Sequence, residues 1–223
     1  MRHNEVECFS DKLECPEENI IVHDLISGGS LQSLLDRVDV VLVGGSGDYS
    51  VAQGGEWLPE AMDHFRELYE LGKPTFASCW GFQAFAKALG GEVVTDLQRA
   101  EVGTHTFELT AAGKLDPVFG KLPSPFRAQA GHQDIVERLP DHATLLSSSS
   151  LVKNEAFTFP GKPIYGTQFH PELEKKDIVL RMNAYPEYIY KITGLTLDEF
   201  IKTCHEAPES NQLLSQFITH VFG

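Results

Sequence analysis

The sequence has no long apolar run, no excess of basic residues and no closely spaced cysteines. No apolar run approaches the roughly 20 residues that cross a bilayer, and the N-terminal MRHNEVECFSDK has no apolar signal-peptide core. The formal net charge is −14, so we do not expect the basic surface that phosphate binding needs. The charge therefore argues against nucleic acid and anionic membranes as partners. We therefore expect a cytoplasmic protein that binds neither nucleic acid nor membrane.

The cysteines also exclude a disulfide framework. Cys8, Cys15, Cys79 and Cys204 include no C-x-x-C pair, and a chain of 223 residues is long enough to bury a sizeable core without covalent cross-links. A structural zinc site would need clustered cysteine and histidine, and these residues are scattered along the chain. Reduced thiols and no metal site are therefore expected, although Cys204 and His205 are adjacent.

Apolar strands alternate with amphipathic helices in the first ninety or so residues. Continuous β-branched runs are typical of strands that are buried on both faces of a parallel sheet. The pattern predicts strands over 20–25, 38–45 and 73–79, and helices over 4–14, 57–72 and 80–91.

The pattern changes after residue 92. Short strand-like pieces separated by turn residues run to about residue 170, and no long helix intervenes, which indicates antiparallel strands. Helical patterns return over about 175–191, 196–206 and 210–221. We predict an α/β fold with a doubly wound, mostly parallel sheet, flanking helices and an added antiparallel section.

One domain over 1–191, with 192–223 as a helical C-terminal extension of it, is the simplest organisation. The extension carries two apolar stripes at helical spacing, which are Leu195, Leu197, Phe200 and Ile201, then Leu213, Leu214, Phe217 and Ile218. These stripes either pack on the chain's own sheet or form the surface of a homodimer or partner complex.

Cys79 lies in ASCWGFQ (77–83), where a predicted strand passes directly into a helix. A nucleophile on such a tight turn is exposed above the sheet, and the first helix amides favour a thiolate and a developing oxyanion. Small residues relieve the crowded backbone, and Ala77 and Gly81 lie two positions on either side. Alternatively, Cys79 is an inert core cysteine.

His170 ends a second predicted strand, in GTQFHPE (166–172). Residues two apart on an extended chain point to the same side, so Glu172 can hold one imidazole nitrogen while the other nitrogen faces a thiol. These two residues then form the base and its orienting group, or else a capped turn.

A glycine-rich loop, VGGSGDYSV (43–51), follows the strand predicted over 38–45. Glycines let backbone amides approach a ligand closely. The loop lacks the lysine of a P-loop and the G-x-G-x-x-G spacing, so a phosphate site is disfavoured, and a plain turn is the other interpretation.

The ordered set of these motifs resembles the class I, or triad-type, glutamine amidotransferases. Cys79, Gly81 and Gln83 match C-x-G-x-Q, a strand ending in Gly-Gly precedes them, and Q-F-H-P-E follows about ninety residues later. The resemblance covers roughly residues 1–190. Within the class, AGHQDIVERLP (130–140) is similar to a segment of stand-alone proteins that resemble the glutaminase domain of GMP synthase.

The resemblance implies a flavodoxin-like fold and a Cys-His-Glu triad. Cys79 matches the nucleophile, His170 the general base and acid, and Glu172 the group that orients the histidine. The amides of Gly45 and Trp80 match the oxyanion hole. Substrate-binding positions are matched by Gln83, Gly44, Ser46 and His132, and Asp134 lies in the same pocket-framing segment. The resemblance implies no metal and no organic cofactor.

The chain departs from the family pattern in four places. Ala77 stands where glycine is usual, Ser46 replaces a proline, and Trp80 and Phe82 are bulky neighbours of the nucleophile. The family fold also opens with a central apolar strand, whereas this sequence begins with a helical pattern. We expect an apolar strand upstream of Met1, which an in-frame stop just before Met1 would exclude.

Three functions follow from the resemblance. The chain releases ammonia from glutamine for a separate synthetase subunit, since no synthetase domain follows residue 190. Alternatively, it is a stand-alone hydrolase or peptidase of γ-glutamyl compounds. The third alternative is a catalytically silent regulatory relative, which the complete Cys-His-Glu set disfavours.

Overall fold

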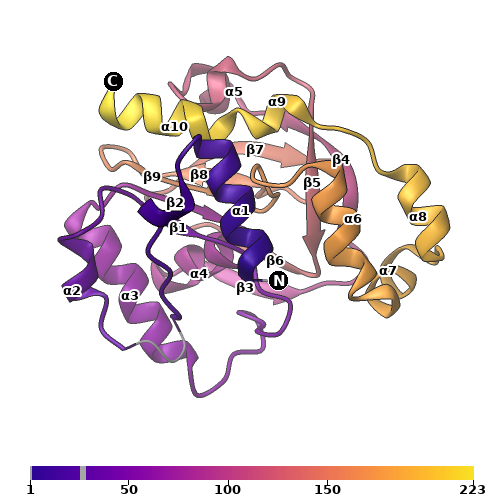
Figure 1. The fold of residues 1–223 in the computed structure, drawn as a ribbon, viewed down its shortest axis with the longest axis horizontal. Coiled ribbons are helices and arrows are strands. Elements are labelled where there is room, and N and C mark those ends of the chain that lie inside the picture. Colours follow the sequence, from indigo (N-terminus) through magenta and orange to yellow (C-terminus); the bar gives the residue numbers. More distant parts are fainter. Residues whose placement is uncertain (1, 26–28) are drawn as a thin grey trace.

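A mixed sheet forms the centre of the computed structural model, which describes residues 2–25 and 29–223 (Figure 1). Seven strands pair in the order β1-β2-β9-β8-β7-β4-β5, and β3 and β6 form a separate two-stranded sheet. The strands are β1 Val41–Val43, β2 Thr75–Ser78, β3 Glu92–Thr95, β4 Glu101–Leu109, β5 Phe126–His132, β6 Asp134–Arg138, β7 Thr144–Ser149, β8 Ala156–Thr158 and β9 Ile164–Thr167.

The direction of pairing changes once along the large sheet. Strands β1, β2 and β9 are parallel, and every further pair from β9 to β5 is antiparallel. The α/β fold with an added antiparallel section is therefore confirmed, and the antiparallel section is the wider part. The carboxyl ends of β2 and β9 lie together, which brings the residues that follow them, 79 and 168–172, to one edge.

Helices cover both faces of the sheet (Figure 1). One core lies under α3 and α4, and a second core lies under α1 and α10. Neighbouring residues on a strand point to opposite faces, so Phe76 enters the second core and Ala77 the first. The helices are α1 Arg2–Leu13, α2 Gln32–Leu35, α3 Leu58–Leu71, α4 Trp80–Ala88, α5 Ala111–Leu115, α6 Lys175–Asn183, α7 Pro186–Thr193, α8 Leu197–Thr203, α9 Pro208–Asn211 and α10 Leu213–Phe222.

The helices predicted near the site are confirmed. Helix α3 has a proline in its first turn and ends at Gly72, whose φ of 61° is the left-handed conformation that glycine adopts without strain. Helix α4 begins at Trp80, one residue after the predicted nucleophile.

The strand predicted over 20–25 is wrong. After the short 3-10 helix η1 (Glu17–Asn19) the chain has no regular structure there, and Ile21 and Val22 are 40% and 50% exposed. A strand needs a neighbour to satisfy its backbone groups. In the described residues β1 is the edge of the sheet and pairs with β2 alone. A cavity of about 340 Å³ separates 20–25 from Leu42 and Val43.

The C-terminal helices are more broken than the periodicity predicts. The expected 175–191 helix is interrupted before Pro186, and the expected 210–221 helix is divided between α9, which starts at Pro208, and α10, which starts at Leu213. Proline lacks the amide that an uninterrupted helix would need, so each proline starts a new helix.

The C-terminal extension packs on the chain's own sheet. Phe217 of α10 is fully buried, and its ring centroid lies 5.5 Å from that of Phe76 and 5.7 Å from that of Tyr165. The side-chain amide of Asn211 donates hydrogen bonds to the carbonyls of Pro171 (2.7 Å) and Leu173 (3.0 Å). The extension therefore holds the segment that carries His170. None of the helices formed by residues 2–25 and 29–223 is long and apolar enough to cross a membrane.

Gly81 sets how closely α4 approaches β1. A Cβ at this position would lie 2.8 Å from the Val43 Cβ and 2.9 Å from the Val43 carbonyl oxygen. We predict that Gly81→Ala lowers the free energy of unfolding, because overpacking costs about 1–3 kcal/mol and outweighs the roughly 0.5–1 kcal/mol that alanine gains in a helix. Urea unfolding measures the free energy of unfolding of this variant. Gly131→Ala is the control, since a Cβ at position 131 makes only ordinary van der Waals contacts. Equal stability of the two variants would contradict this packing.

Candidate active site

Cys79 occupies a strained turn between β2 and α4. Its φ of 51° and ψ of −100° lie outside the regions that non-glycine residues favour. A residue in such a conformation costs on the order of 1–3 kcal/mol and persists only where its surroundings enforce it. The Cys79 amide donates a 2.7 Å hydrogen bond to the Thr167 carbonyl of β9, which ties the turn to the neighbouring strand. Ala77 is not among the residues with positive φ, so its methyl group fits in β2.

His170 and Glu172 form the hydrogen bond that their spacing predicts. The distance from His170 Nδ1 to Glu172 Oε1 is 2.6 Å, and both side chains are buried. The His170 amide donates to the Gln129 carbonyl of β5 at 2.8 Å, which fixes the backbone beneath the ring. The other ring nitrogen, Nε2, therefore faces away from Glu172.

Gly45 lies where the side chains of Cys79 and His170 meet. A Cβ at Gly45 would be 2.9 Å from the His170 Cε1, 3.7 Å from its Nε2 and 3.6 Å from the Cys79 Cβ. Any larger residue at position 45 would therefore displace the imidazole. The glycine-rich loop, the turn at Cys79 and the histidine segment thus converge on one point.

The charges in this group favour an imidazolium. Burial opposes protonation of His170, but the negative charges of Glu172 and Cys79 outweigh it and raise the pKa of His170 to about 10. Burial likewise opposes ionisation of Glu172, but His170 and then Arg181 outweigh it and lower the pKa of that carboxyl. The histidine and the carboxylate therefore stabilise each other's charged forms.

Asp134 anchors the glycine-rich loop to the pocket wall. Its carboxylate accepts hydrogen bonds from the Ser50 hydroxyl (2.6 Å), the Ala52 amide (3.3 Å) and the Thr95 hydroxyl (2.6 Å). One buried side chain thereby joins the loop to the β3–β6 sheet.

Two glutamine side chains extend from the cysteine into the protein. The Gln168 side-chain amide nitrogen lies 3.7 Å from Cys79 Sγ, and its amide oxygen accepts from the Gln83 side chain at 3.2 Å. Gln83 also donates to the Asp134 backbone carbonyl at 2.9 Å. Gln83 is 4% exposed, and in this structure its amide group is occupied by protein partners.

The Gly45 amide binds a carboxyl oxygen in this structure. It donates a 3.2 Å hydrogen bond to Glu5 Oε1 of α1. Arg181 Nη1 lies 4.0 Å from this oxygen and 4.0 Å from Glu172 Oε1. The amide therefore points into a position that accepts a negatively charged oxygen, and a substrate oxygen bound there has to replace Glu5.

A cavity of about 230 Å³ opens beside Cys79. Polar groups dominate its wall. The cavity next to α1 is larger, but Cys79 does not line it. Residues that line the smaller cavity are Ser46, Gly47, Asp48, Tyr49, Ser50, Gln53, Gly54, Trp57, Cys79, Gln83, Gly131, His132, Gln133 and Asp134.

The remaining predicted residues divide between the pocket and the core. Ser46 lines the pocket, and Gly44 lines the larger cavity. His132 lines the pocket, but its Nε2 contacts Glu101 Oε2 at 3.2 Å. The ring of Trp80 packs 5.9 Å from that of Phe65 in the first core, while its amide begins α4, where helix amides lack internal acceptors.

Phe82 stacks on Phe157, with 4.8 Å between ring centroids, and is fully buried. It therefore shapes the core and not the pocket mouth. Glu5, Arg181 and Gln168 were not predicted from the sequence as site residues. Gln168 stands inside the Q-F-H-P-E motif and could have been found there. Glu5 and Arg181 carry no local signal, because they reach the site only through the packing of α1 and α6.

Comparison with known proteins places the chain among glutamine-hydrolysing relatives. A family described as "Glutamine amidotransferase class-I" matches residues 15–179. One subunit of the glutamine-hydrolysing GMP synthase of Methanocaldococcus jannaschii is 34% identical over 154 residues, which cover 69% of this chain and 72% of that protein. The corresponding subunit from Methanothermobacter thermautotrophicus is 36% identical over 121 residues, which cover 54% of this chain and 62% of that protein.

Longer relatives are matched over a smaller share of their own length. The alignment with the glutamine-hydrolysing GMP synthase of Caldicellulosiruptor saccharolyticus, at 37% identity, covers 48% of this chain and 20% of that protein. Among solved structures, a glutamine amidotransferase from Thermotoga maritima superposes with a TM-score of 0.70 at 22% identity, covering 89% of this chain and 84% of the other. The glutamine amidotransferase from Methylobacillus flagellatus superposes with a TM-score of 0.71 at 17% identity, and the match covers 95% of this chain and 87% of the other. These structures share the fold.

Glu172→Gln tests the electrostatics of the histidine. The Glu172 carboxylate is the neighbouring charge that most stabilises the His170 imidazolium. Without it, we predict that the pKa of His170 falls from about 10 by at least ~1 unit. NMR titration of labelled histidine side chains measures this value. Glu187→Gln, which changes an exposed carboxylate on α7, is the control and leaves the titration unchanged.

The same variant changes how stability depends on pH. The folded pKa of His170 lies above its ordinary 6.5, so the imidazolium contributes stability that is complete below pH 6.5 and is lost as pH rises through about 10. Glu172→Gln should lose much of this dependence in urea unfolding between pH 6 and 10. A variant whose histidine titration and pH–stability profile match those of the unaltered protein would contradict the assigned pairing.

Proposed function

The chain belongs to the class I glutamine amidotransferase family, and from this premise we propose that it hydrolyses the side-chain amide of glutamine through a thioester on Cys79. The single observation that carries the mechanism is the convergence at Gly45. Atoms of the Cys79 and His170 side chains both lie within 4 Å of the point where a Cβ at Gly45 would stand, and Cys79 lines a polar cavity. A cysteine, an imidazole and a backbone amide that can donate to a substrate oxygen in place of Glu5 are the parts that acyl transfer needs.

The first half-reaction forms the thioester. The Cys79 sulfur attacks the side-chain carbonyl carbon of glutamine, and the negative charge moves to the carbonyl oxygen. The amides of Gly45 and Trp80 donate to this oxyanion in place of the Glu5 carboxylate. As the carbon–nitrogen bond breaks, the His170 imidazolium donates its proton to the leaving nitrogen, and ammonia departs.

The second half-reaction restores the enzyme. His170, now neutral, takes a proton from water as the water oxygen attacks the thioester carbon. The carbon–sulfur bond breaks, glutamate leaves, and the thiolate and imidazolium are regenerated. Glu172 holds Nδ1 throughout, so that Nε2 carries both proton transfers. No step requires a metal or an organic cofactor.

The relatives support delivery of the ammonia to another protein. Both archaeal relatives are named as one subunit of a glutamine-hydrolysing GMP synthase. The matched region is about a fifth of the Caldicellulosiruptor saccharolyticus GMP synthase. We infer that the chain acts as the glutaminase of a two-subunit enzyme, with a separate ATP-dependent synthetase as its partner.

Cys79→Ala is the direct test of this function. Removing the nucleophile should lower kcat for ammonia release from glutamine by at least about 10³-fold, because no other group can form the thioester. A coupled glutamate assay follows the reaction. Cys15→Ala is the matched control, since Cys15 is a free cysteine outside the pocket, and it should retain full activity.

The choice of substrate and partner is tested with the same proteins. Glutamine hydrolysis that rises when a co-purified synthetase is added would support the two-subunit enzyme. Hydrolysis of γ-glutamyl peptides in preference to glutamine would overturn it in favour of a stand-alone hydrolase. Activity that persists unchanged in Cys79→Ala would overturn the mechanism.

A further inference from the structure

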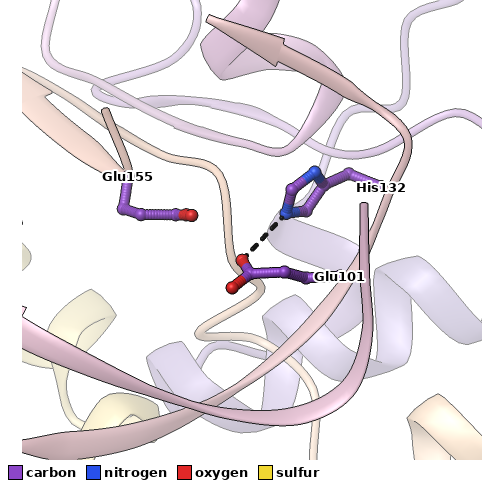
Figure 2. A group of neighbouring side chains, drawn as sticks. All are labelled: Glu101, His132 and Glu155. Atoms are coloured by element: carbon purple, nitrogen blue, oxygen red, sulfur yellow. Dashed lines mark hydrogen bonds and ion pairs between the residues drawn. The ribbon is translucent and has the colours of Figure 1, made fainter. Parts of the chain in front are cut away.

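Three buried side chains converge behind the pocket (Figure 2). Glu101 begins β4, His132 ends β5 directly opposite it in the register, and Glu155 comes just before β8. They are 1%, 3% and 0% exposed, respectively. Their candidate ligand atoms all lie within 4.8 Å of one another, and Figure 2 shows the two carboxyl groups and the imidazole turned toward a common centre.

The Glu155 carboxyl group faces Glu101 and Ser149 without a well-formed hydrogen bond. Within the described part of the chain, both of its oxygens are buried and neither has a hydrogen bond of ordinary geometry, whereas Glu101 Oε2 contacts His132 Nε2 at 3.2 Å. An ionised carboxylate buried without a partner costs several kcal/mol, so a positive charge or a proton has to accompany it.

The protein supplies little positive charge here. Among the ion pairs of the described residues, none includes Glu155, and Glu101 is approached by His132 and by His105, whose Nδ1 lies 3.6 Å from Glu101 Oε1. Within the part of the chain that the structure describes, no lysine or arginine forms an ion pair with Glu101 or Glu155. The compensating charge therefore comes either from protons or from a bound cation.

We propose that Glu101, His132 and Glu155 bind one divalent transition-metal ion of the zinc class, with these three protein ligands and a fourth position that water would fill. Two carboxylates neutralise such an ion, and it satisfies the Glu155 oxygens that the protein leaves unpaired. The imidazole ligand favours zinc-class ions over Mg²⁺ and Ca²⁺, which prefer oxygen ligands alone.

The dimensions agree with such a site. Zinc lies about 2.0–2.2 Å from nitrogen and oxygen ligands, which places the ligand atoms of a tetrahedral site roughly 3.3 Å apart. His132 Nε2 and Glu101 Oε2 are already 3.2 Å apart, so Glu155 alone has to move closer. Its backbone is fixed by the bonds Glu155 N to Ser147 O (3.0 Å) and Gln168 N to Glu155 O (2.7 Å), so a rotation of the side chain makes this adjustment.

The site would stabilise the wall behind the nucleophile. Gly131, which precedes His132, has its carbonyl oxygen 3.9 Å from Cys79 Sγ. Gln168, whose amide binds the Glu155 carbonyl, places its side chain 3.7 Å from the same sulfur. The ion would thus join β4, β5 and the segment before β8. Of these, β5 contacts the cysteine through Gly131, and the segment before β8 reaches it through Gln168.

A proton is the competing occupant. Burial and then the negative charge of Glu101 raise the pKa of Glu155 well above its ordinary value when no cation is bound. His132 Nδ1 is buried without a partner in the described residues, and it stays unsatisfied whichever occupant is present. The two states therefore differ in metal content and in the charge of Glu155.

Metal content of the full chain provides the first test. The protein is produced in zinc-supplemented medium and analysed by elemental mass spectrometry. The variant Cys79→Ala is analysed in the same way, because without this thiol it cannot bind zinc at the proposed nucleophile. We expect close to one zinc per chain in both proteins. Glu155→Gln and His132→Ala should retain about a tenth of this or less, and Glu108→Gln, an exposed carboxylate on the same strand β4, should retain it fully.

Refolding gives a second readout that does not depend on activity. Protein unfolded with a chelator and refolded with Zn²⁺ should melt at least about 5 °C higher than protein refolded without it, and Glu155→Gln should show no such difference. Refolding with Co²⁺ should give a tetrahedral visible spectrum that Glu155→Gln lacks. Zinc-free protein with identical melting under both conditions, or zinc that Glu155→Gln retains, would overturn the proposal.

Discussion

The strained backbone at Cys79 is the constraint on which the rest of the site depends. With φ at 51°, the residue turns directly from β2 into α4, so Cys79 lies at the carboxyl edge of β2 and directly precedes the helix. The expected exposure of this residue is wrong, because Cys79 is buried and only 6% exposed. The surrounding contacts hold this conformation. The Cys79 amide is bound to Thr167 of β9, and Gly81 lets α4 approach Val43. The parallel pairing of β2 with β9 then brings the segment that ends in His170 to the same edge. Fold and chemistry are joined through these few contacts.

A second layer of polar contacts supports this edge. Asp134 holds the glycine-rich loop, Gln168 and Gln83 extend inward from the sulfur, and Asn211 holds the carbonyls on either side of Glu172. The C-terminal extension therefore supports the candidate site, because Asn211 binds the segment that carries the histidine and its carboxylate. Glu101, His132 and Glu155 complete the layer from behind, where an ion would tie together the strands that form the pocket wall.

Much of this could be predicted where the signal is local. The elbow at Cys79 and the pairing of His170 with Glu172 follow from short motifs whose spacing fixes their geometry. The place of Gly45 beside both was implied by the family resemblance alone. Helix α3, with its proline start and its end at Gly72, is equally local. The strand predicted over 20–25 failed because an apolar run forms a strand only beside a neighbour, and β1 is the edge in the described residues.

Glu5, Arg181 and the buried Glu101–His132–Glu155 group could not be predicted from the sequence, because tertiary packing alone brings them together.

The central claim, that Cys79 carries the acyl group, is tested most directly by acid quenching during turnover of glutamine, followed by peptide mass spectrometry. The account predicts a γ-glutamyl adduct on the peptide that contains Cys79 and on no other cysteine peptide. Glutamate production at full rate with an unmodified Cys79 peptide, or an adduct on Cys15 instead, would contradict it.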